Sequence, residues 1–284
     1  MRAATIFVVM LCLGTSARLC AQAASATPAH IETVQDLLPR LTPEQKQRFE
    51  AAIQAHQQAR YADSLESFKG LQKDLPGEII IAKFAANNAL ETGDISFVVA
   101  QLKPITQANP DDWQACAMLT RAYAESGDKV NRDAGMTYML DLHKRGLTPQ
   151  NMQKYTLERA KVGDNVMVIQ TSLEPWGYYK VYDLGQVSDG SGQIFLQTTL
   201  ESNDFDQPGF AKRYPKEASQ GLRQFSLDAY RETGLNSNGQ KTQTHYTYQF
   251  FVGQPSYDTV REAFINIASG KSKPISSRSN IIVP

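Results

Sequence analysis

The sequence of 284 residues is poor in the groups that usually carry chemistry: it has three cysteines, four histidines and no net charge. A balanced charge argues against a large phosphate-binding surface, and so against nucleic acid as a partner. No pair of histidines or cysteines has the spacing of a metal site, and glycine-rich phosphate loops and nucleophile elbows are missing. We therefore expect no metal, no cofactor and no enzymatic activity.

Long apolar runs are equally scarce, and the only one lies at the N-terminus. Residues 3–13 are apolar and uncharged, follow Arg2, and lead to small residues of the Ala-x-Ala type at 21–26. The run is shorter than the roughly 20 residues that span a bilayer. This pattern predicts a signal peptide over residues 1–26, with an uncleaved anchor or a buried helix as the alternative. The protein should then be periplasmic or secreted, with no transmembrane segment after cleavage.

Cleavage after residue 26 would leave Cys116 as the last cysteine of the chain. A mature protein with one cysteine cannot form an internal disulfide, although an exported protein would meet an oxidising compartment. We interpret Cys116 as a small apolar residue on a helix.

A repeat organises the first half of the chain. Proline recurs at positions 76 and 110, and small residues at 59, 93 and 127, in both cases 34 residues apart. Between these markers the apolar positions have helical spacing, and Gly-Asp follows the first helix of the second and third units. Each unit therefore predicts two amphipathic helices joined by a turn.

The period, the Gly-Asp turns and the closing proline resemble the tetratricopeptide repeat over about residues 44–147. Generic helical hairpins are the alternative. The sequence departs from the family at Arg48, Ala82 and Cys116, where a large aromatic residue is usual. The resemblance implies a solenoid of about three helix pairs, whose first helices hold a protein or peptide partner in a groove.

Both ends of this helical domain, expected over residues 27–163, have recognisable signals. Thr42, Pro43 and Gln45 form a capping-box start. Thr148 and Pro149 open a segment, ending near Lys161, that we expect to be a capping helix covering the last exposed apolar face.

From residue 165 the hydrophobic period changes from that of a helix to that of a strand. Five alternating segments predict strands, at 166–171, 178–187, 193–201, 224–232 and 242–252. Tight turns between them favour antiparallel order. Ser256 then caps a helix that ends at Gly270 and must bury its apolar stripe on the sheet. The predicted class is α+β, with a sheet-and-helix domain over 164–270 and a flexible tail over 271–284.

The resemblance implies a set of partner-binding residues on the first helices of the pairs: Phe49, Ile53, Lys83, Asn87 and Arg121. Lys83 and Asn87 are four residues apart on one helix face. They resemble the pair with which some family members clamp a terminal carboxylate. A protein-binding or scaffold module is therefore the leading functional hypothesis.

Two alternatives use the second half of the chain. Aromatic residues on the strands could line a ligand groove and make the protein a small-ligand carrier: Trp176, Tyr178, Tyr246 and Tyr248. Such residues are more often cross-strand pairs that fill a sheet face. An unrecognised enzyme with a site at the domain junction is the other alternative.

Overall fold

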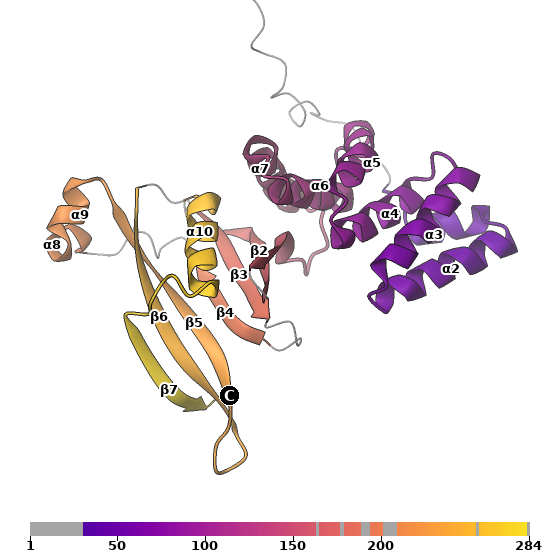
Figure 1. Ribbon diagram of the computed structural model, residues 1–284. Coiled ribbons are helices and arrows are strands. Elements are labelled where there is room, and N and C mark those ends of the chain that lie inside the picture. The colour runs from indigo at the N-terminus through magenta and orange to yellow at the C-terminus, as the bar shows by residue number, and fades with distance from the viewer. Residues whose placement is uncertain are drawn as a thin grey trace, which may run out of the picture.

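The computed structural model describes residues 31–162, 165–176, 179–188, 194–200, 209–253 and 256–282 (Figure 1). The expected signal peptide, residues 1–26, lies outside this range. Within it the chain is α+β: helices between residues 34 and 144 are followed by an antiparallel sheet and a C-terminal helix. The predicted fold class is confirmed.

Six long helices form three successive pairs in the first half of the chain. A short helix α1 (Val34–Leu37) and a 3₁₀ turn η1 (Leu38–Arg40) precede them. The pairs are α2 (Pro43–Gln57) with α3 (Tyr61–Asp74), α4 (Ile79–Thr92) with α5 (Ile95–Ala108), and α6 (Trp113–Glu125) with α7 (Lys129–Lys144).

The sequence signals at the helix ends take the expected geometry. Thr42 accepts a hydrogen bond from the backbone N–H of Gln45, as a capping box requires. Gly93 has φ of +81°, a left-handed conformation that favours glycine, and the following Asp94 caps α5 through its side chain.

Small and aromatic residues share the helical core. In α4, Ala85, Ala86 and Ala89 are fully buried, which lets neighbouring helices approach closely. Phe49 packs edge-on against Phe68 at a centroid distance of 5.6 Å. The first helices of the pairs share a surface, because α2 and α4 line one hollow and α4 and α6 line another.

The described residues of the second half of the chain form a seven-stranded sheet in which every strand pairs antiparallel with its neighbours in sequence. The strands are β1 (Lys154–Val162), β2 (Asn165–Trp176), β3 (Tyr179–Ser188), β4 (Ile194–Leu200), β5 (Arg223–Leu235), β6 (Lys241–Val252) and β7 (Ser276–Ile282). The five predicted strands correspond to β2–β6.

The expected capping helix up to Lys161 is wrong, because most of that segment is strand β1. Tyr155 and Leu157 are buried in the core that the last helix pair shares with the sheet. β1 also contacts α6 and pairs with β2, so the end of the helical array is covered by a sheet edge. The sheet therefore begins at Lys154, ahead of the boundary expected at residue 164.

The expected flexible tail over 271–284 is also wrong for its central part. Residues 276–282 form β7, which pairs antiparallel with β6 from Thr242↔Ile282 to Thr247↔Ser276. Hydrogen bonding to β6 orders this polar segment, which carries little of the apolar alternation by which strands are recognised.

Helix α10 (Tyr257–Ala268) packs on one face of the sheet, as predicted (Figure 1). Its N-cap Ser256 accepts from the backbone N–H of Thr259. The buried stripe of Val260, Phe264 and Ile267 shares a core with the sheet and with α7.

Short helices α8 (Phe210–Arg213) and α9 (Pro215–Ser219) precede β5. None of the helices in the described part of the chain is long and apolar enough to cross a membrane.

Candidate binding groove

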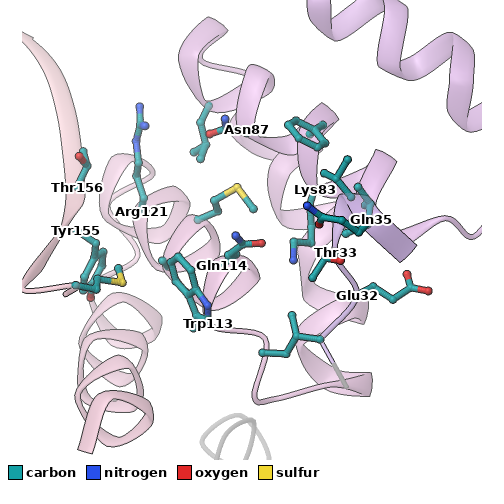
Figure 2. A pocket seen from close by; sticks show the side chains of 18 residues that line it. Glu32, Thr33, Gln35, Lys83, Asn87, Trp113, Gln114, Arg121, Tyr155 and Thr156 are labelled. Atoms are coloured by element: carbon teal, nitrogen blue, oxygen red, sulfur yellow. The ribbon is translucent and has the colours of Figure 1, made fainter. Parts of the chain in front are cut away.

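A groove of about 740 Å³ lies where the helical array meets the sheet. The N-terminal segment forms one side of it and β1 the other, with α4 and α6 between them. Figure 2 shows this arrangement: Thr33 and Gln35 face Tyr155 and Thr156 across the space, and Trp113 projects into it. Apart from Val34 and Gln35 of α1, the helical residues that line the groove belong to α4 and α6, the first helices of the second and third pairs.

Most of the lining is apolar. The largest members come from α4, α6, β1 and the segment just before β1, and they include two flexible methionines: Ile80, Phe84, Leu90, Trp113, Met118, Met152 and Tyr155. Three charged side chains also line it: Lys83, Arg121 and Glu32, which pairs with Arg40 over 3.1 Å. The other polar side chains are uncharged: Thr33, Gln35, Asn87, Gln114 and Thr156. An apolar lining with a few polar groups is typical of a binding site, and methionine adapts its shape to different partners.

Lys83 points into this region but its charge is already neutralised. The Nζ atom lies 3.1 and 2.9 Å from the two carboxylate oxygens of Asp112, and the two residues are 5% and 2% exposed. Asp112 also accepts from the backbone N–H of Ala115, 3.1 Å away, and so caps α6. The pair joins α4 to the start of α6, which indicates a structural role for Lys83.

Arg121 is compensated in the same way. It donates to Glu91 and Glu125, each over 2.7 Å, and is 7% exposed. Burial opposes its charge, but the two carboxylates outweigh this effect and raise the pKa of Arg121 above its usual value. Glu91 also pairs with Arg159, whose backbone N–H donates to Glu125 over 2.9 Å. This network fixes β1 to α4 and α6.

The structure thus brings Lys83, Asn87 and Arg121 into one groove, as the resemblance implied. Both cations have internal counter-ions. The terminal carboxylate of a peptide would have to compete with Asp112 for the Lys83 ammonium. Asn87, the other residue of the expected clamp, lines the groove and is uncharged.

Phe49 and Ile53 lie elsewhere on the same helical face. They line a second hollow of about 420 Å³ with Val34, Leu38 and Phe84. Phe49 is only 3% exposed and belongs to the aromatic core, whereas Ile53 is partly buried. Val34 and Phe84 line both hollows, so the short N-terminal helix α1 lies between them.

Tyr246 and Tyr248, two of the candidate aromatic residues, lie in a different part of the molecule. Tyr248 is 8% exposed and belongs to the core under α10, and Tyr246 packs against that core. The backbone of Trp176 ends β2, while its side chain and the whole of Tyr178 lie outside the described residues.

The domain junction holds a buried ionic cluster. Glu158 of β1, 1% exposed, accepts from the Tyr257 hydroxyl and is bound by the Arg261 guanidinium through several hydrogen bonds. Arg132 of α7 stacks over the Tyr257 ring and pairs with Asp258 over 2.9 Å. These contacts join α7, β1 and α10. Among the described residues, no group of histidine, cysteine, aspartate and glutamate side chains could hold a metal ion.

Sequence reasoning missed several groove residues. Asp112 carried a signal, because an aspartate directly before an amphipathic helix predicts an N-cap. The ion pair of Asp112 with Lys83, and the contribution of residues 31–35 and β1 to the groove, depend on contacts between distant segments. Comparison with protein-family models, curated proteins and solved structures finds no match for this chain.

Proposed function

We propose that this chain is an exported protein, related to the tetratricopeptide repeats, that binds a peptide segment of a partner protein in the groove between α4, α6 and β1. The observation that carries the proposal is the apolar groove of about 740 Å³ on the face formed by the first helices of the pairs. The 34-residue period and the N-terminal signal pattern in the sequence support it.

The groove favours an apolar segment over a charged one. Lys83 and Arg121 already have carboxylate partners, so an anionic ligand would have to displace buried counter-ions. An apolar side chain can instead cover Trp113 and Met118 without disturbing these pairs. The expected interaction is therefore driven by apolar burial, with Asn87 and Gln114 available for hydrogen bonds at the margin.

The test is an affinity capture from envelope extract with three forms of the protein: wild type, Ala117→Arg and Val130→Arg. Ala117 lines the groove, so a long charged side chain there obstructs it. Val130 is 74% exposed on α7 and provides a matched arginine outside the groove. Thermal unfolding of all three forms shows whether the fold is kept.

We expect wild type and Val130→Arg to retain the same partner, and Ala117→Arg to lose it while still folded. Equal capture of the partner by all three folded forms would show that the partner binds outside the groove. Capture of nothing by wild type would count against a binding module altogether. Substitution of Lys83 is unsuited to this test, because it leaves the Asp112 carboxylate buried without its counter-ion.

A further inference from the structure

The N-terminal segment already lies on the helical face in the way that a bound peptide would. Val34, Leu37, Leu38 and Leu41 have the i, i+3, i+4, i+7 spacing of a helix that inserts one apolar face into a groove. Leu37 is fully buried and Leu41 is 6% exposed, both within the core of the helical array. Val34 and Leu38 pack against this core.

This segment divides one surface into two hollows. The hollow of about 740 Å³ lies towards α6 and β1, and the hollow of about 420 Å³ lies over α2. Both include Val34 of the segment and Phe84 of α4. Withdrawal of α1 would therefore join them into one groove that runs from Ile53 to Tyr155.

Among the described residues, the burial of Leu37 and Leu41 is the main contact of the segment with the helical array. Its α-helical part is four residues long, too short to be stable by itself. Thr33 and Asp36 cap it locally. Its ion pair to α4's N-cap residue Glu78 comes from Arg40, whose side chain is 41% exposed, so solvent and salt screen the attraction. A peptide with the same apolar spacing would gain the same contacts.

We propose that residues 34–41 are a removable occupant of the groove, and that the partner is an amphipathic helical peptide with apolar residues at i, i+3, i+4 and i+7 that displaces them. This inference rests on the proposed function and adds the class of partner and the regulation of the site. The tethered segment competes with the partner and lowers its apparent affinity.

The probe is a fluorescent synthetic peptide with the sequence of residues 31–41, titrated with purified protein and followed by anisotropy. The protein forms are wild type, Val34→Asp/Leu37→Asp, the milder Leu37→Ala, and Val130→Asp as a matched exposed control. A short tether holds its own segment at an effective concentration on the order of 1 mM. If the peptide itself binds near 0.1 mM, wild type should bind it about tenfold more weakly than the double variant does.

We expect Leu37→Ala to give an intermediate affinity, Val130→Asp to behave as wild type, and a peptide with aspartate at positions 34 and 37 not to bind. Equal binding of the probe by wild type and the double variant would overturn the inference. So would the absence of binding to a double variant that keeps its circular dichroism spectrum and its thermal transition.

Hydrogen exchange of the wild-type protein decides the matter if the double variant does not fold. We expect the amides of residues 34–41 to exchange well before those of α4, and equal protection of the two segments would overturn the inference.

The partner capture separates the two proposals. A partner held equally by wild type and Leu37→Ala contradicts the displacement alone. Failure of both wild type and Leu37→Ala to capture a partner, combined with binding of the probe, contradicts the proposed function alone.

Discussion

The buried pair of Lys83 and Asp112 allows a quantitative test of the helical half of the structure. Substituting Lys83→Met keeps most of the apolar stem and removes the charge. Asp112, 2% exposed, then lacks the ammonium that lies 2.9 Å from its carboxylate. Removal of one member of a buried ion pair costs about 3–5 kcal/mol. We expect the free energy of unfolding to fall by about that amount.

A second substitution separates the charge from the other role of Asp112. Asn at this position still caps α6, because it can accept the hydrogen bond from the backbone N–H of Ala115. In Lys83→Met/Asp112→Asn neither charge is present. Replacement of a whole buried pair by neutral groups is often close to neutral in stability. The double variant should therefore recover about 2 kcal/mol or more relative to Lys83→Met alone.

The assay is urea unfolding of the four proteins of this cycle, followed by tryptophan fluorescence with Trp113 close to the pair, together with calorimetry. A loss of less than about 0.5 kcal/mol in Lys83→Met would be typical of a surface residue. That result would refute the stabilising buried ion pair between Lys83 and Asp112. It would also mean that Lys83 can bind the carboxylate of a ligand.

Two further predictions concern packing and pH. A methyl group on Gly135 would clash with the hydroxyl oxygen of Thr120 on the facing helix, so Gly135→Ala should cost about 1–3 kcal/mol in urea unfolding. The same substitution should cost much less in a Thr120→Ala background, and an equal cost there would contradict the close approach. Burial works to raise the pKa of Glu91, but Arg121 and Arg159 lower it overall, so its folded-state pKa lies below the unfolded value of about 4.3. Its contribution to the free energy of unfolding is therefore present above about pH 4.3 and is lost as the pH falls through the folded-state pKa. Glu91→Gln should flatten the acid side of the plot of unfolding free energy against pH. Parallel plots for the two proteins would refute the assignment.

Local signals in the sequence were enough for most of the elements. A residue such as Thr42 or Ser256 acts on backbone groups within three positions of itself, and a glycine such as Gly93 needs a left-handed conformation in its own turn. The helical and strand periods likewise depend on neighbours along the chain. The helix pairs, the antiparallel order of β2–β6 and helix α10 were therefore predictable.

The two errors in the fold have a common physical cause. Residues 154–162 and 276–282 become strands because β2 and β6 supply hydrogen-bonding partners to them. A helical or unstructured state was compatible with their own sequence, and the sheet overrode it.

Only part of the groove could be predicted from the sequence. A 34-residue register placed Lys83, Asn87 and Arg121 on the first helices of the pairs, and the structure brings these three together. The charge state of the site depends on Asp112 and Glu91, which approach Lys83 and Arg121 only when α4 and α6 pack side by side.

The amino-acid sequence by itself thus determined the repeat, the helix ends, most of the strands and the position of Lys83, Asn87 and Arg121 on the first helices of the pairs. Tertiary structure alone decided that β1 closes one side of the groove, that Val34–Leu37 lies across that face, and that the buried cations are neutralised. The reason is the range of the interactions. Caps, turns and hydrophobic periods act between residues close in sequence, whereas a groove and its ion pairs exist only between segments that packing brings together.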